Sequence, residues 1–339
     1  ATTEIYTLSL HDALPIYNQV MTTIDEFNKI TQTMYDKGYV LVSPHDMAVV
    51  NDDGTMSKGK IMLPEGKIPF VLSQDDVSYY HYMDGDGCAS KLVLDENGDV
   101  KTEYIDADGN VLVGDYDLVP LLDSFIKEHP DFSYHGRKGI LAMTGYDGVL
   151  GYRTDIAYKT GKKLQDDQKK FLEDHPDFNY KQEVKNAKKV AKAMKAEGWE
   201  FASHTWGHIN LSSSSLERVQ ADTKRWMDEV GSLVGPTTIL YYPHGARPDG
   251  DDVQQTGPIF KYLQEQGFRV FASVGISSYS KIKTDICAVI CDRLHPDGTT
   301  LRGSDKVIGW YSQFYDARDI INLDVRPDRG VKWTPKSAS

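Results

Sequence analysis

The chain has 339 residues, of which 40% are apolar and 26% are charged, a composition typical of globular proteins rather than disordered or fibrous ones. Its 38 Lys and Arg residues against 50 Asp and Glu residues give a net charge of −12, so we expect no nucleic-acid partner. No apolar run approaches the ~20 residues that a helix needs to cross a bilayer, so we expect no membrane span. The length fits about two domains or one large α/β barrel domain.

The first sixteen residues differ in character from the rest of the chain. Residues 1–16 read ATTEIYTLSLHDALPI, which resembles the translation of a common sequencing-library adaptor. We therefore interpret them as an artefact of sequence assembly and exclude them from fold prediction. On this interpretation His11 and Asp12 carry no chemistry, and the genuine N-terminus, with any signal peptide, anchor or first strand, is missing.

Apolar periodicity predicts an alternation of helices and strands. Residues spaced close to 3.6 apart predict a helix over 22–37, and a strand over 39–43 follows Gly38. Further strands are expected over 68–73, 139–144, 199–203, 238–242, 268–273 and 285–292, and further helices over 117–128, 182–197, 215–230, 257–266 and 316–321. This alternation predicts an α/β domain with a largely parallel sheet, open or closed.

Three alternating segments within 84–114 predict a small β insertion with Asp- and Gly-rich turns. We expect one catalytic domain over 17–325 that carries this insertion, followed by a loose tail over 326–339. The three cysteines form an odd, low count that argues against a disulfide framework. Cys287 and Cys291 lie in one predicted strand with Cα atoms about 13 Å apart, too far to bridge.

Polar residues that could bind a metal or take part in catalysis lie where predicted strands end. Asp75 and Asp76 close the strand over 68–73, and His204 follows the strand over 199–203, with His208 four residues further on. Ligands of α/β sheets bind outside the carboxyl ends of the strands. One carboxylate and two imidazoles from neighbouring strand ends could hold a divalent ion and leave positions open for water and substrate.

Zinc is the first choice for such a ligand set, although cobalt or nickel could fit it. A bound ion of this kind lowers the pKa of water toward ~7, which makes hydroxide available at neutral pH. If Asp76 binds the metal, Asp75 remains to accept a proton from the attacking water. Taken singly, the His pair and the Asp pair also fit an ordinary packed site and a solvated turn.

The order of these motifs resembles that of the polysaccharide deacetylases of the NodB homology type, a carbohydrate esterase family. Ser73-Gln-Asp-Asp76 is similar to the first family motif, Thr-Phe-Asp-Asp. His204-Thr-Trp-Gly-His208 matches the second, His-Ser/Thr-x-x-His, and Tyr241-Tyr-Pro-His-Gly245 resembles the third, Arg-x-Pro-Tyr-Gly. The resemblance covers roughly residues 17–325, and the second motif is its most specific part.

The resemblance implies an irregular (β/α) barrel of about seven strands and a cell-surface or extracellular location. It also implies roles for particular residues. Asp75 would be the general base, the backbone N–H of His244 would contribute to the oxyanion hole, and Asp76, His204 and His208 would bind the metal.

Two departures from the family pattern bear on catalysis. The third-motif arginine, which would orient the catalytic aspartate, is Tyr241 in this chain. The late motif that supplies the general acid, Leu-x-Leu-x-His, has no clean copy. His295 follows the strand over 285–292 and is our candidate for the acid, with His244 as the rival. A solvent-exposed turn histidine is the simpler interpretation of His295.

Aromatic residues near the motifs could form a surface on which sugars stack. We expect substrate contacts from Trp206, Tyr146, Tyr241 and Pro243, with Trp206 foremost because it lies between two proposed ligands. Ordinary packing is the alternative for each of them. The remaining aromatic residues considered for this surface are Tyr79, Tyr80, Tyr82, Tyr152 and Trp310.

These observations predict a metal-dependent hydrolase that removes acetyl groups from an N- or O-acetylated glycan such as peptidoglycan or a chitin-like polymer. A carbohydrate-binding pseudo-enzyme on the same fold is the first alternative, favoured by the changes at Tyr241 and in the late motif. A glycosidase is the second, but it needs two carboxylates about 5 to 10 Å apart across a cleft, which neighbouring Asp75 and Asp76 do not obviously provide.

Overall fold

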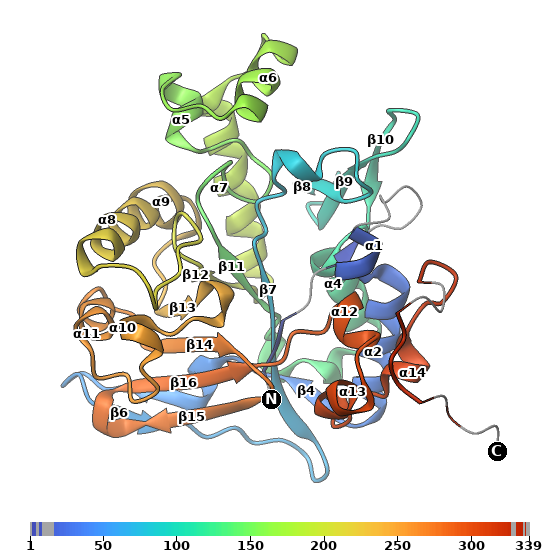
Figure 1. The fold of residues 1–339 in the computed structure, drawn as a ribbon, viewed down its shortest axis with the longest axis vertical. Helices are drawn as coiled ribbons and strands as arrows, with labels where there is room; N and C mark the ends of the chain where they lie inside the picture. Colours follow the sequence, from blue (N-terminus) through green and yellow to red (C-terminus); the bar gives the residue numbers. More distant parts are fainter. Residues whose placement is uncertain (1, 5–6, 9–16, 327–329, 335, 337–339) are drawn as a thin grey trace.

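A curled sheet of nine strands forms the centre of the protein (Figure 1). The computed structural model describes residues 2–4, 7–8, 17–326, 330–334 and 336, so His11 and Asp12 lie outside the described residues. The strands in spatial order are β1 (Thr2–Glu4), β7 (Ile68–Asp75), β11 (Ile140–Met143), β12 (Glu200–Ser203), β13 (Ile239–Tyr241), β14 (Val270–Val274), β16 (Ala288–Arg293) and β15 (Tyr279–Lys283), while β4 (Tyr39–Leu41) pairs with the start of β7.

The strands from β7 through β11, β12, β13 and β14 to β16 form a continuous parallel run. β15 pairs antiparallel with β16. This sheet confirms the predicted α/β class, and its six-strand parallel run with flanking strands agrees with a barrel-like curl. Because all strands of the run point the same way, their carboxyl ends meet at one edge of the sheet.

β1 is a short strand within the segment that we interpret as an adaptor translation. Thr2–Glu4 pairs in parallel with Val71–Ser73 of β7, immediately after the residues of β7 that pair with β4. It also lies against β16, so it contributes to the curl of the sheet. The artefactual origin of residues 1–16 stays a prediction.

The helices cover the outside of the curl (Figure 1). Helices α2, α4 and α12–α14 gather on the right of the view, α8–α11 on the left, and α5–α7 at the top. Their bounds are α1 (Tyr17–Val20), α2 (Ile24–Asp36), α3 (Pro44–Met47), α4 (Leu118–Glu128), α5 (Ile156–Thr160), α6 (Asp166–Asp174), α7 (Tyr180–Ala196), α8 (Leu216–Trp226), α9 (Ser232–Val234), α10 (Pro248–Asp251), α11 (Pro258–Glu265), α12 (Gly298–Leu301), α13 (Asp305–Tyr311) and α14 (Ala317–Ile320).

Alternation along the strands divides the apolar residues between the inside and the outside of the curl. One buried cluster contains Val71 of β7, Ala142 of β11, Ala202 of β12, Ala272 of β14 and Cys291 of β16. Their neighbours along the strands face the helices in two further clusters. This period of two is the pattern of a sheet covered on both faces.

The predicted insertion is a three-stranded antiparallel sheet of β8 (Ala89–Leu94), β9 (Val100–Ile105) and β10 (Val111–Gly114). Leu92 of β8 is fully buried, and its backbone N–H donates to the carbonyl of Leu150. The insertion is thereby attached to the loop that follows β11. Cys88, Cys287 and Cys291 are free thiols, as the sequence predicts.

Two segments differ from the sequence prediction. The hairpin of β5 (Ala48–Val50) and β6 (Met56–Lys58) was not expected, because its residues lack a clear alternation. Trp333 donates from Nε1 to the Leu301 carbonyl, and Thr334 contacts Asp305, so this part of the expected loose tail packs on the domain. Among the described residues, no helix combines the length and apolar character needed to cross a bilayer.

Candidate active site

The carboxyl ends of β7 and β12 bring the predicted metal ligands together. Asp76 follows the last residue of β7, His204 follows the last residue of β12, and His208 lies in the loop after it. One ligand atom from each of these three side chains lies within 4.8 Å of the others. This spacing suits three donors around a common ion.

His204 is oriented by a hydrogen bond on its far side. Its Nδ1 lies 2.8 Å from the Tyr241 carbonyl, which can only accept, so Nδ1 carries the proton and Nε2 is left as the atom that could bind a metal. The side chain is 2% exposed. A ring nitrogen bonded to a backbone carbonyl fixes both the tautomer and the ring direction of a metal-ligating histidine.

Asp76 is held by a neighbouring hydroxyl. Tyr80 donates to its Oδ1 at 3.0 Å, and the same hydroxyl lies 2.5 Å from Thr144 Oγ1. Asp76 Oδ2 lies 3.6 Å from His208 Nε2. Burial lowers the pKa of His208, an effect that the charge of Asp76 opposes. The neutral imidazole that results at neutral pH is the form that binds a metal.

The loop that carries His208 is anchored from α8. Asp222 accepts from the backbone N–H of Trp206 at 2.6 Å and from that of Gly207 at 2.9 Å. Burial raises the pKa of Asp222, while these two hydrogen bonds oppose the increase. Asp222 therefore fixes the backbone between the two histidines that are predicted to bind a metal.

The backbone of the site adopts left-handed conformations at non-glycine positions. Asp76, Thr205, His208 and His244 have φ of 58°, 57°, 49° and 59°. Such φ values are uncommon for residues with a side chain, and they cluster at functional sites where the surrounding structure holds them. These four residues follow the carboxyl ends of β7, β12 and β13.

Asp75 is bound by an arginine that the sequence prediction did not include. Arg293, the last residue of β16, donates from its two terminal nitrogens to the two carboxylate oxygens of Asp75 at 2.8 and 2.9 Å. The side chains are 0% and 1% exposed. His204 Nε2 lies 3.5 Å from Asp75 Oδ2. This carboxylate therefore borders Asp76, His204 and His208, which we call the ligand cluster.

A cavity of about 310 Å³ opens over the ligand cluster. The predicted base, the three predicted ligands and both candidate acids share it: its walls include Asp75, Asp76, His204, His208, Tyr242, His244, Gly245, Val274 and His295. The predicted catalytic and metal residues are thus brought to one place, while their roles stay predictions.

His295 and His244 differ in their surroundings. His244 is exposed, and its ring centroid lies 4.4 Å from that of His208. His295 is only partly exposed, which differs from the solvent-exposed turn histidine of the simpler interpretation. Burial lowers its pKa, while the charges of Asp297 and Asp75 oppose the decrease.

The substrate contacts predicted for Tyr241 and Pro243 need correction. Both residues are buried, and Tyr241 is 0% exposed. Tyr241 ends β13 and points into the curl of the sheet, where the Arg293 guanidinium lies 4.2 Å from its ring centroid. Strand alternation places Tyr241 inside, so a polymer in the cavity cannot reach it.

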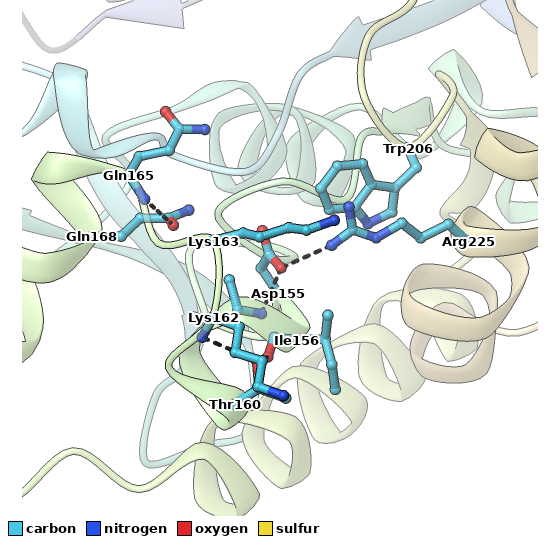
Figure 2. A pocket seen from close by; sticks show the side chains of 10 residues that line it. Asp155, Ile156, Thr160, Lys162, Lys163, Gln165, Gln168, Trp206 and Arg225 are labelled. Carbon is cyan, nitrogen blue, oxygen red and sulfur yellow. Dashed lines mark hydrogen bonds and ion pairs between the residues drawn. The ribbon is translucent and has the colours of Figure 1, made fainter. Parts of the chain in front are cut away.

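Trp206 lines a neighbouring cavity of about 360 Å³ rather than the one over the ligand cluster. Figure 2 shows Arg225 beside its indole, and the guanidinium lies 3.2 Å from the ring centroid. Arg225 also pairs with Asp155. One face of the indole is therefore covered, and the substrate contact predicted for Trp206 stays a prediction. Tyr146 is partly exposed and stacks on Tyr80, and its substrate contact stays a prediction.

Sequence reasoning missed the roles of Arg293 and Tyr80. The available signal for Arg293 was its place at the carboxyl end of a buried strand, two residues before His295, the candidate acid. Tyr80 was considered only as a stacking residue, because its distance from Asp76 along the chain does not reveal the direction of its hydroxyl.

Comparison with known proteins adds a sequence match to this geometry. The family model described as Polysaccharide deacetylase matches residues 177–269, a segment that contains the second and third motifs. No curated protein matches the chain.

Solved structures give distant matches over most of the chain. They include the Streptococcus pyogenes deacetylase PplD in complex with acetate, with 14% identity, a TM-score of 0.47 and coverage of 88% of this chain and 92% of that one. They also include the polysaccharide deacetylase BC0361 from Bacillus cereus and the putative polysaccharide deacetylase BA0330 from Bacillus anthracis. Each of these two has 10% identity, a TM-score of 0.43 and coverage of 92% of this chain and 68% of the matched chain. The sequence match confirms, for residues 177–269, the polysaccharide deacetylase family that the motifs predict.

Proposed function

We propose that the protein is a metal-dependent hydrolase that removes acetyl groups from an N- or O-acetylated polysaccharide. The observation that carries this proposal is the convergence of Asp76, His204 and His208 within 4.8 Å, with Asp75 beside them in the same cavity. A carboxylate and two imidazoles are suitable donors for zinc, and cobalt or nickel would also fit them. The fixed direction of His204 Nε2 supports this choice.

A divalent ion held by these three residues would polarise the acetyl carbonyl and lower the pKa of water. The protein groups have separate tasks. Asp75 accepts a proton from the water whose oxygen attacks the carbonyl carbon. The backbone N–H of His244 donates to the oxyanion that forms. The bond to the sugar nitrogen or oxygen then breaks, His295 donates a proton to that atom, and acetate leaves.

The substrate of this reaction would be a glycan outside the cell, such as peptidoglycan or a chitin-like polymer. The family match supports an acetylated polysaccharide, and the cavity of about 310 Å³ has room for an acetyl group beside the predicted metal ligands. A cell-surface or extracellular location follows from such a substrate.

The proposal is tested by acetate release from acetylated chitooligosaccharides and from acetylated xylan, which separate N-acetyl from O-acetyl substrates. We expect release that disappears on chelation and returns when zinc, cobalt or nickel is added. The Asp75→Asn, His204→Ala double variant should release no acetate. Undiminished release by this variant would refute the proposal.

Metal binding without turnover on any acetylated glycan would instead favour the carbohydrate-binding pseudo-enzyme. The departure at Tyr241 is the observation in favour of that alternative, since Tyr241 replaces the arginine of the resembled motif. Titration with zinc alone, followed by the acetate assay on the loaded protein, distinguishes the two functions.

A further inference from the structure

Asp75, in the wall of the cavity over the ligand cluster, forms a buried charge pair with a residue from a distant part of the sequence. Arg293 of β16 and Asp75 of β7 are 218 residues apart, yet both guanidinium nitrogens that face the carboxylate lie within 2.9 Å of its oxygens. Arg293 Nη1 also donates to Ser73 Oγ at 3.0 Å. A parallel fork of this kind fixes the plane of a carboxylate as well as its position.

Arg293 also rests on the ring of Tyr241. Its guanidinium carbon lies 4.2 Å from the ring centroid, at a distance where the aromatic face attracts a cation. Tyr241 is fully buried and ends β13, so it forms a rigid support under the guanidinium. Tyr241 occupies the position of the arginine in the resembled third motif, and Arg293 lies between its ring and Asp75.

We propose that Arg293 is the positioning residue of Asp75, and that β16 delivers from another strand the guanidinium that Tyr241 does not supply. This inference rests on the proposed function, in which Asp75 accepts the proton from water. With both oxygens held by the fork, the carboxylate keeps one orientation toward the cavity. A base displaced by about 1 Å can lose roughly 10²-fold in rate, which is why its orientation matters.

A purely structural pair would have the same chemistry, and the chain contains one. Arg326 donates from Nε and Nη2 to the two oxygens of Glu26, both at 2.8 Å, with side chains 1% and 0% exposed. It lines none of the cavity over the ligand cluster. Arg326→Met is therefore a matched control for the cost of removing a buried arginine.

The first measurement compares Arg293→Met, Arg293→Lys and Arg326→Met with the unchanged protein. We expect Arg293→Met to lower kcat roughly 10²-fold with little change in KM. Arg293→Lys keeps the charge but not the bidentate hydrogen bonds, so its kcat should lie between that of Arg293→Met and that of the unchanged protein. Zinc affinity should be unchanged, since Asp76, His204 and His208 remain. Arg326→Met should lower the melting temperature but not kcat below the melting temperature.

The second measurement moves the guanidinium back to β13. The Tyr241→Arg, Arg293→Met double variant should recover most of the lost kcat, whereas Tyr241→Arg alone places a second cation beside Asp75 and should lower stability. Recovery would distinguish orientation of Asp75 from a general effect on folding, because a structural role of Arg293 predicts no rescue from another strand.

Several results would overturn the inference. They are a kcat for Arg293→Met equal to that of the unchanged protein, a loss of zinc affinity that parallels the loss of kcat, or a double variant no more active than Arg293→Met. Absence of acetate release by the unchanged, zinc-loaded protein would overturn the proposed function and the role of Arg293 with it. Activity of the unchanged protein thus separates failure of the inference alone from failure of both.

Discussion

Two buried arginine–carboxylate pairs in this protein are both bidentate but have different surroundings. Arg293 and Asp75 meet at the carboxyl ends of strands, where Asp75 borders an open cavity and the ligand cluster. Arg326 and Glu26 meet where the C-terminal segment crosses the start of α2.

The remaining partners of the two carboxylates account for the difference. Glu26 also accepts from the backbone N–H groups of Thr23 and Asn322, so it closes a helix cap and attaches the C-terminal segment to it. Asp75 faces a cavity in which a reactant could lie. A buried ion pair is therefore weak evidence of function, and its access to a cavity is what distinguishes the catalytic candidate.

The largest effect is expected from removing the two carboxylate charges in parallel. Asp75→Asn should lower kcat roughly 10²–10⁴-fold, because an amide cannot accept the proton from water. Glu26→Gln should leave kcat unchanged. Each substitution leaves a buried arginine without its counter-charge, which costs about 3–5 kcal/mol of unfolding free energy. Acetate release and urea denaturation of both variants measure the two effects. Equal losses of kcat would erase the contrast between the pairs.

A second test concerns the neighbour that holds Asp76. Tyr80→Phe removes the hydroxyl that donates to Asp76 Oδ1 at 3.0 Å. Loss of such an outer partner typically lowers metal affinity roughly 10–100-fold. Competition with a fluorescent zinc chelator measures the affinity. Tyr82→Phe is the control, because Tyr82 stacks on Tyr80 but is 57% exposed. Equal zinc affinity for both variants would contradict a role of Tyr80 in orienting the ligand.

The sequence was sufficient for the strand ends but not for the contacts between them. Asp76, His204 and His208 follow continuous apolar strands, and the parallel run makes their convergence a consequence of topology. The contact between Arg293 and Asp75 depends on how far the sheet curls, because the curl brings the end of β16 close to the end of β7. Periodicity along one strand carries no information about that curl.

The same limit explains why the surroundings of Tyr241 and Trp206 could not be predicted. Tyr241 lies in a motif, but strand alternation turns its side chain inward, and the parity of the strand could not be fixed from its three residues. The cover on Trp206 comes from Arg225 of α8, which lies nineteen residues later on another element. Both outcomes depend on packing between elements.

A third, smaller effect concerns a carboxylate that supports the site without facing its cavity. Asp222→Ala would leave the N–H groups of Trp206 and Gly207 without their acceptor, at a cost of about 1–3 kcal/mol in unfolding free energy. Asp228→Ala, which removes an exposed pair with Lys224, should cost about 0–1 kcal/mol. Denaturant titration of both variants checks this order, and equal costs would contradict it.

The smallest effect is expected from Asp117, a buried carboxylate that accepts hydrogen bonds from the neutral donors Tyr79, Gln74 and Leu118. Burial raises its pKa to about 6, which those hydrogen bonds oppose. The unfolded value is about 3.9, so the folded protein holds the proton more tightly. The stabilisation from this group is complete below about pH 4 and is lost as the pH rises through about 6.

Asp117→Asn removes this titration while keeping a similar shape, so the melting temperature of the variant relative to the unchanged protein should rise between about pH 4 and 6.5. Asp106 gives the opposite sign, because hydrogen bonds with Asn110 lower its pKa and its stabilisation is lost as the pH falls. The melting temperature of Asp106→Asn relative to the unchanged protein should therefore stay level between about pH 4 and 6.5 and rise only as the pH falls below about 4. A pH-independent difference for Asp117→Asn would show that its carboxyl group titrates alike in the folded and unfolded chains.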